Sequence, residues 1–158
     1  MNPKVKVVIK NPASATWNVP GATFNDLNPF NSTANASAWY TQEVKPSATS
    51  AGGAINSVTL TLVSTITMPI WQGYNSGTVA QKQEWDRFYQ AAKAHELRHH
   101  EIAIKGTNKL ADTIRAATDL QTPQLQSIYD TAIAEIDKLQ RKYDVDTQRG
   151  TTEGVVLD

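Results

Sequence analysis

The chain has 158 residues, 40% of them hydrophobic and 19% charged, and its 15 basic side chains balance 15 acidic ones. This length and composition predict one globular domain, residues 1–158, and exclude wholesale disorder. Zero net charge argues against nucleic acid or an anionic membrane as a partner, and no stretch approaches the roughly 18 apolar residues of a membrane span. Without cysteine, any metal must be held by imidazole and carboxylate groups.

The first 70 residues have the pattern of β-strands. Polar and apolar residues alternate from Lys4 to Ile9 and again from 38 to 44, which predicts a strand in each place. The clearest strand is predicted over residues 58–68, and we expect it to end at Pro69, because proline cannot donate to a sheet. Residues 46–57 are rich in turn formers without periodicity and are expected to form a mobile hairpin loop.

Residues 78–143 predict a helical hairpin. Thr78 and Gln81 have the spacing of a capping box, and some forty residues without proline follow them. A second, antiparallel helix is predicted from Pro123 to about Tyr143, with an irregular tail over 144–158. The fold class predicted is α+β, with an antiparallel or mixed sheet packed on two helices. Gly106 is the weak position inside the first helix, whose predicted buried stripe is Trp85, Phe88, Ala92, Leu110 and Ile114.

The residues that carry chemistry form the sequence His-Glu-Leu-Arg-His at positions 95–99. Residues four apart share one face of a helix, so His95 and His99 can bind one Zn²⁺ ion with Glu96 beside them. Such an ion acidifies a bound water, and the neighbouring carboxylate takes the water proton as general base. The alternative without function is a solvated helical face that happens to hold histidines. His100 points about 100° away from His99 and is expected to be exposed or to support the site from outside.

A catalytic zinc normally keeps three protein ligands and a water, so a third ligand must come from a carboxylate or a tyrosine. Counting 1.5 Å per residue along two antiparallel helices places residues near 142 level with residue 97. Asp144 is therefore the first candidate and Asp146 the second, and an aspartate that merely ends a helix is the structural alternative. Tyr143 and Arg149 are candidates to donate a hydrogen bond to an oxyanion, and either can equally be structural.

Several short stretches occur in an order and spacing that is similar to a known family. They are Val19–Phe24, Pro69–Trp71, Glu84–Phe88, the histidine motif, and Tyr143–Gly150 with Glu153 and Gly154 following. Together they resemble, over nearly the whole chain, a bacterial family of proposed zinc-dependent proteases catalogued as domain of unknown function 922. Only the histidine motif is specific by itself.

The resemblance implies a zincin-like fold, and it bears on the third ligand and on location. The family pattern near the C-terminus reads Tyr-Asp-x-x-Thr-x-His-Gly, and here Arg149 stands in place of that histidine. If the histidine is the family's third ligand, this chain has lost it; if the aspartate is, Asp144 preserves the site. Most relatives carry signal sequences, which implies a periplasmic or secreted protein whose leader is absent here, whereas a complete chain would be cytoplasmic.

The leading interpretation is a monomeric zinc metallopeptidase that acts on a peptide or protein substrate. In it the long strand lies against the active-site helix, and an edge strand holds an extended substrate by backbone pairing. A zinc esterase or phosphoesterase is the second interpretation, because the same activated water attacks any electrophile that fits. The third is a non-catalytic binding module with a degenerate metal site. Glu96 argues against it, since a structural metal needs no general base.

Overall fold

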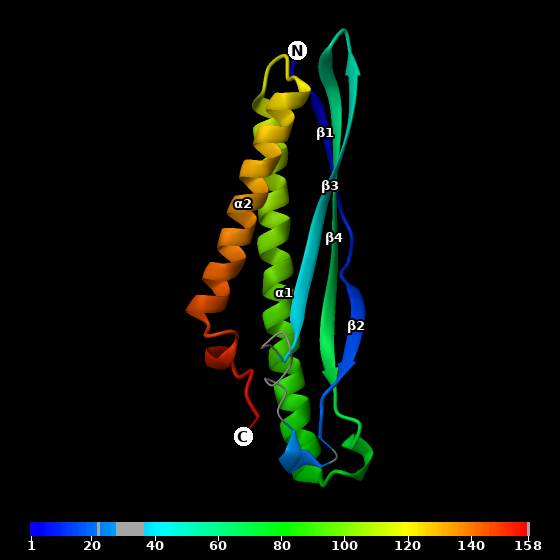
Figure 1. Ribbon diagram of the computed structural model, residues 1–158, viewed down its shortest axis with the longest axis vertical. Coiled ribbons are helices and arrows are strands. Elements are labelled where there is room, and N and C mark those ends of the chain that lie inside the picture. Colours follow the sequence, from blue (N-terminus) through cyan, green and yellow to red (C-terminus); the bar gives the residue numbers. More distant parts are fainter. Residues whose placement is uncertain (22, 28–36, 158) are drawn as a thin grey trace. The chain divides into compact units, whose positions relative to one another are not determined.

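The computed structural model describes residues 1–21, 23–27 and 37–157. Ala22, part of the Val19–Phe24 stretch, lies outside the described residues, as does Asp158 at the end of the tail. The chain is α+β, as predicted, with a sheet and two long helices (Figure 1). In chain order the elements are β1 (Lys4–Ile9), β2 (Ala13–Asn18), η1 (Phe24–Asp26), β3 (Trp39–Ala51), β4 (Ala54–Ile70), η2 (Tyr74–Ser76), α1 (Val79–Ala116), α2 (Thr122–Asp146) and η3 (Thr151–Glu153).

The chain divides into two compact units, which are described separately below. The first unit comprises Met1–Pro12, Gln42–Ser64 and His100–Arg141, and the second comprises Ala13–Thr41, Thr65–His99 and Lys142–Asp158. Each of the long elements β3, β4, α1 and α2 contributes residues to both units. The sequence motif at 95–99 and the region that follows residue 142 both belong to the second unit.

β4 is the central strand of the sheet. β1 pairs in parallel with residues 57–62 of β4 in the first unit, and β2 pairs in parallel with residues 65–70 in the second. β3 also pairs with β4, and the two are joined by Gly52 and Gly53, whose φ angles are 62° and 87°. Two successive positive φ angles are what a two-residue hairpin turn needs. The sheet is therefore mixed.

Two predicted boundaries in the β region are wrong. Residues 46–57 do not form a loop, because β3 runs to Ala51 and β4 starts at Ala54, and the two glycines alone make the turn. The strand that was expected to end at Pro69, β4, also does not end there. It continues to Ile70, whose carbonyl accepts a hydrogen bond from the Val19 N–H at 3.0 Å. Proline removes only its own donor, so the pairing with β2 continues past it.

α1 begins where the capping box predicts. The Thr78 N–H donates to Gln81 Oε1 at 2.9 Å, and the Gln81 N–H donates to Thr78 Oγ1 at 3.3 Å. The predicted stripe of this helix is confirmed, because all of its members are at most 5% exposed: Trp85, Phe88, Ala92, Leu110 and Ile114.

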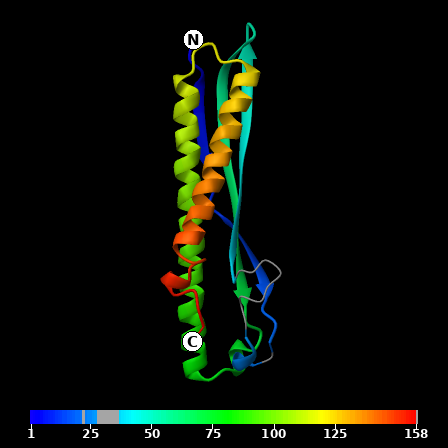
Figure 2. The same cartoon turned by 60° about the vertical axis from the view of Figure 1, so that its left-hand side comes forward.

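In the first unit α2 returns beside α1, as both views show (Figures 1 and 2). Gly106 faces Ile136 there, and a Cβ atom on Gly106 would lie 2.2 Å from Ile136 Cγ1. The weak position in α1 is thus the place where α2 comes close. α2 ends at Asp146, three residues after the predicted end near Tyr143, so the irregular tail begins later than predicted and contains the short helix η3.

The core of the second unit is rich in aromatic side chains, with Trp71 and Trp85 4% and 5% exposed and their ring centroids 5.9 Å apart. Val155, from the segment after α2, packs into the same core and is 2% exposed. Burial of this valine holds the end of the chain against the first half of α1. That contact matters for the site, since both segments contribute to it.

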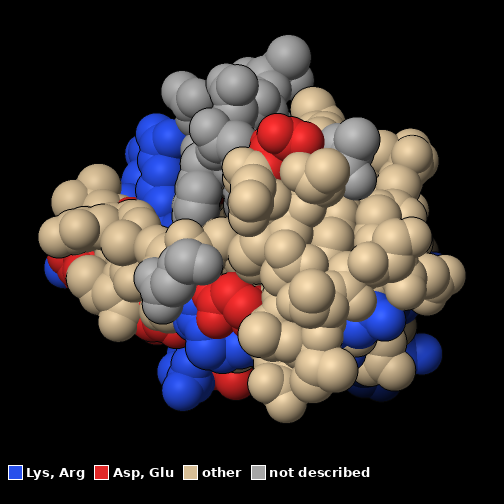
Figure 3. Space-filling view, turned by 90° about the horizontal axis from the view of Figure 1, so that it is seen from below, with Lys and Arg blue, Asp and Glu red and all other residues tan. Residues whose placement is uncertain are grey.

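Charged side chains on the face seen in Figure 3 form small groups of both signs among a larger uncharged area. This distribution agrees with the balanced charge of the sequence. Among the residues that the structure describes, no helix is both long and apolar enough to cross a membrane.

Candidate metal centre

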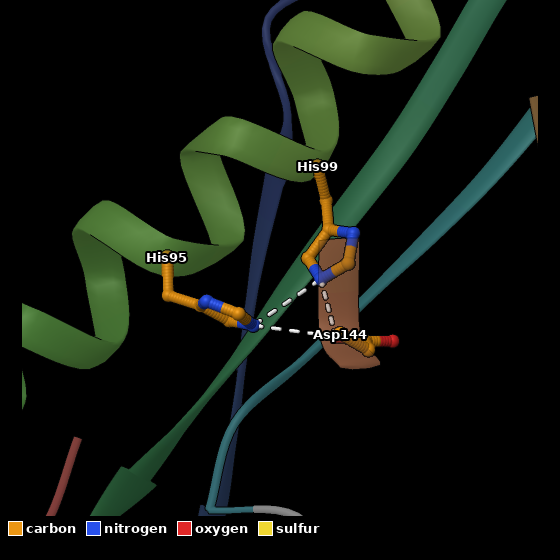
Figure 4. Close-up of side chains that lie close together, drawn as sticks. All are labelled: His95, His99 and Asp144. Atoms are coloured by element: carbon orange, nitrogen blue, oxygen red, sulfur yellow. Dashed lines mark hydrogen bonds and ion pairs between the residues drawn. The ribbon is translucent and has the colours of Figure 1, made fainter. Parts of the chain in front are cut away.

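Three side chains of the second unit converge on one point: His95 and His99 from α1, and Asp144 from α2 (Figure 4). The two histidine Nε2 atoms are 3.3 Å apart, and Asp144 Oδ1 lies 3.0 Å from Nε2 of His99 and 3.4 Å from Nε2 of His95. Tetrahedral ligands with bonds of about 2.0–2.1 Å to zinc are about 3.3 Å from one another. The spacing and the two-imidazole, one-carboxylate donor set therefore fit a zinc ion.

The local fold explains why these residues meet. His95 and His99 are one helical turn apart on α1 and are 5% and 6% exposed. α2 stays helical through residue 146, so Asp144 projects from a regular backbone rather than from a loop. Its side chain is 41% exposed. The histidines are thus buried in the protein, and the carboxylate is the ligand that borders solvent.

Hydrogen bonds between the two histidines and Asp144 shift the pKa values of Asp144 and His95. Burial opposes ionisation of Asp144, but hydrogen bonds with His95 and His99 outweigh it and hold the pKa of this carboxyl well below its usual range. Burial would likewise lower the pKa of His95, yet its hydrogen bonds to Asp144 and Glu153 raise the pKa above the ordinary value. The aspartate is therefore ionised near neutral pH, which is the form that binds a metal.

Glu96 is almost fully buried next to the two histidines, with 4% of its surface exposed. Burial raises the pKa of its carboxyl to about 7, and the negative charge of Asp144 adds to this effect while His99 and His95 oppose it. A group whose pKa is near the operating pH can both accept and release a proton. The position and the pKa of Glu96 are compatible with the general-base role that the sequence predicts for it.

His95 has a further partner, which sequence reasoning did not assign to the site. Its Nδ1 atom lies 2.8 Å from Glu153 Oε2, although 58 residues separate the two. The Tyr143 hydroxyl donates to both carboxylate oxygens of Glu153, at 3.0 and 2.8 Å. The Tyr143 ring also stacks on His95, with centroids 4.8 Å apart and planes at 20°.

With this geometry described, the chain can be compared with known proteins. The family model described as "Bacterial protein of unknown function (DUF922)" matches residues 17–151. The chain belongs to this family. No curated protein and no solved structure gives a significant match. The family predicted from the sequence is confirmed, while its description names no activity, so zinc binding and proteolysis stay predictions.

Two residues of the family's C-terminal pattern were candidates to donate to an oxyanion. Tyr143 already donates its hydroxyl proton to Glu153, and burial together with this hydrogen bond raises the pKa of the phenol. Arg149, which replaces the histidine of the family pattern, has an exposed side chain and a φ of 56°. Its N–H donates to the carbonyl of Asp144 at 2.6 Å. The Arg149 backbone thus caps the end of α2 directly behind the candidate ligand.

The remaining candidates lie outside the cluster. The carboxylate of Asp146 pairs with Lys142 one helical turn earlier, so Asp144 rather than Asp146 joins the histidines. His100 is not exposed, since only 8% of its surface is accessible. In the first unit its Nδ1 lies 3.2 Å from Ser64 Oγ of β4. The expectation that His100 is exposed is therefore wrong, because β4 covers this side chain.

Proposed function

We propose that this protein is a zinc-dependent hydrolase, and specifically a metallopeptidase with a zincin-like arrangement. The observation that carries the proposal is the mutual spacing of 3.0–3.4 Å among two imidazole nitrogens and one carboxylate oxygen, from His95, His99 and Asp144. Two histidines and a carboxylate are a donor set of catalytic zinc sites, which keep one position for water or substrate.

Zinc held there would lower the pKa of a coordinated water and polarise the scissile carbonyl. Glu96 is the residue that handles protons. Its carboxylate accepts the proton that water loses when water attacks the carbonyl carbon, and it returns that proton to the departing amine nitrogen. The raised pKa of Glu96, about 7, suits both halves of this transfer. The hydrogen bond between His95 Nδ1 and Glu153 holds that ring in the fixed orientation that a metal ligand needs.

The neighbourhood of the site supports a peptide as substrate. Tyr40, at the start of β3, stacks on His99 with ring centroids 6.1 Å apart and planes at 9°. Within the described part of the chain β3 pairs only with β4, so β3 has a second edge. An extended peptide can pair with such an edge through its backbone. β3 would then deliver the peptide bond beside the metal ligands.

The test combines metal analysis with an activity assay on purified full-length protein. We expect about one zinc per chain by mass spectrometry, and cleavage of unfolded casein and of a quenched peptide library. An ester substrate run in parallel separates peptidase from general hydrolase chemistry. Glu96→Gln should keep its zinc and lose cleavage, because it removes the proton acceptor and leaves the ligands.

The matched pair for the third ligand is Asp144→Asn and Asp146→Asn, which remove one charge each from the same helical turn. Asp144→Asn should lose most of its zinc, and Asp146→Asn should keep it, because only Asp144 contacts the histidines. Wild-type protein that stays free of zinc after zinc is offered would overturn the proposal. Full cleavage by Glu96→Gln would overturn the assigned mechanism.

A further inference from the structure

His95 is enclosed by the part of the chain that runs from the end of α2 to residue 157. Glu153 accepts a hydrogen bond from Nδ1 of His95, and the Tyr143 ring covers one face of the His95 imidazole. Gly150 lies so close that a Cβ atom there would be 3.2 Å from His95 Cγ. We call residues 147–157 the C-terminal strap. His95 is therefore oriented by the strap as well as by its own helix.

The bond between Glu153 and His95 has a definite chemical effect. An imidazole that offers Nε2 to a metal carries its proton on Nδ1, and Nε2 of His95 is the atom that faces His99 and Asp144. A carboxylate on Nδ1 fixes that tautomer, prevents ring rotation and makes Nε2 a better electron donor. The Tyr143 hydroxyl in turn restrains the Glu153 carboxylate.

Arg87 holds the strap from α1, two turns before His95. Its guanidinium donates to the carbonyl oxygens of Gly154 at 2.9 Å and of Val156 at 2.7 Å. Nε of the same guanidinium donates to Glu84 Oε2 at 2.8 Å, which fixes its orientation. Gly154, whose carbonyl is one of the two acceptors, has a φ of 88°, which a residue with a Cβ rarely adopts.

These contacts give a role to the Glu84–Phe88 stretch, which the proposed hydrolytic chemistry leaves unused. We infer that Glu153 is a positioning residue for the metal ligand His95, and that Arg87 docks the strap so that Glu153 reaches Nδ1. The inference rests on the proposed metal site and extends it. Glu84, Arg87, Tyr143 and Glu153 are linked through the strap, and the chain of contacts ends on His95.

The experiment measures the affinity of the full chain for Zn²⁺ and Co²⁺ alone, by competition with a chromophoric chelator. Glu153→Ala should weaken binding by about 10- to 100-fold, the loss usual for the hydrogen-bond partner of a ligating histidine. Glu153→Gln should recover part of this loss, since its amide oxygen still accepts from Nδ1. Arg87→Met, which keeps the length of the side chain without its donors, should weaken binding by about tenfold. Asp137→Asn, which removes an exposed carboxylate from α2, is the control and should bind as wild type.

The visible absorption spectrum of the Co²⁺ form is the second readout, because it reports ligand geometry. It should change in Glu153→Ala and be partly restored in Glu153→Gln. If wild type binds neither metal, the proposed function fails. If wild type binds and both Glu153 variants bind with unchanged affinity and spectrum, the strap inference fails while the metal site stands. Glu153→Gln decides the question should Glu153→Ala not fold.

Discussion

Substitution of Gly150 by alanine should lower the free energy of unfolding, because the strap has no space for the added Cβ atom. Gly150 has a φ of 84°, and an added Cβ would lie 2.6 Å from Val155 Cγ2, well inside the ordinary contact distance of 3.4–4 Å. Val155 is 2% exposed and has little space to move. Gly53 offers a matched control, since its φ is 87° and nothing lies within 4 Å of its added Cβ.

The two variants separate backbone strain from overpacking. A residue with a Cβ in the left-handed region costs about 1–2 kcal/mol, and this applies to Gly150→Ala and Gly53→Ala alike. Forcing extra volume into a packed core adds about 1–3 kcal/mol, and this applies to Gly150→Ala alone. We therefore expect losses of unfolding free energy of about 2–5 kcal/mol for Gly150→Ala and about 1–2 kcal/mol for Gly53→Ala.

Urea denaturation in the presence of a chelator measures both losses by linear extrapolation. A Val155→Ala background completes the cycle, because it removes the methyl group that the new Cβ meets. In that background the closest contact is gone, while Val155 Cβ at 3.1 Å and His95 Cγ at 3.2 Å remain near the new Cβ. Most of the overpacking cost should therefore disappear, and the two substitutions should be less than additive by about 1–3 kcal/mol. Equal losses at the two glycines, or strict additivity with Val155→Ala, would refute the reasoning.

Three further expectations follow from other parts of the chain. Gly106→Ala should lower the free energy of unfolding by about 1–2 kcal/mol, because its Cβ would meet Ile136 at 2.2 Å and overpacking exceeds the gain in helix propensity. In an Ile136→Ala background the same change should stabilise the protein. A loss of stability in both backgrounds would contradict this reasoning. Thr78→Ala should cost about 1 kcal/mol in the same denaturation assay, because it removes the acceptor of the capping box. Burial raises the pKa of Glu96 from 4.5 to about 7, so the folded, zinc-free protein binds this proton more tightly than the unfolded chain and its stability should fall by about 3 kcal/mol as pH rises from 4.5 to above 7. Glu96→Gln should remove the Glu96 part of that slope and leave the part due to His95, whose raised pKa acts in the same direction. A slope unchanged in this variant would assign it to another group.

The sequence predicts well what depends on local periodicity and on helix geometry. The capping box at Thr78 and the buried stripe of α1 need only contacts within a few residues, and both are confirmed. Asp144 could be selected because a straight helical hairpin converts residue counts into distances along its axis. Asp144 lies beside the two histidines even though α2 is longer than predicted, because the position of Asp144 along the helix depends on where α2 begins.

The sequence fails where two distant segments decide the outcome. The length of β3 is set by its pairing with β4, and residues 46–50, Pro-Ser-Ala-Thr-Ser, show no alternation of polar and strongly apolar side chains that would reveal it. Glu153 lies between two left-handed glycines, Gly150 and Gly154, and only the folded strap brings it to His95. The only sign of Glu153 in the sequence was its place among the stretches that resemble the family, and this resemblance did not indicate what Glu153 does.

The order of the site residues along the chain has a consequence for biosynthesis. His99 and Asp144 are 45 residues apart, and Glu153 follows His95 by 58. Ribosomes add about 5–20 residues per second, so roughly 3–12 s pass between synthesis of His95 and synthesis of Glu153. During that interval the nascent chain carries its histidines without the carboxylates that complete and orient them. The proposed hydrolytic centre would therefore be incomplete for as long as the chain that carries it is still being made.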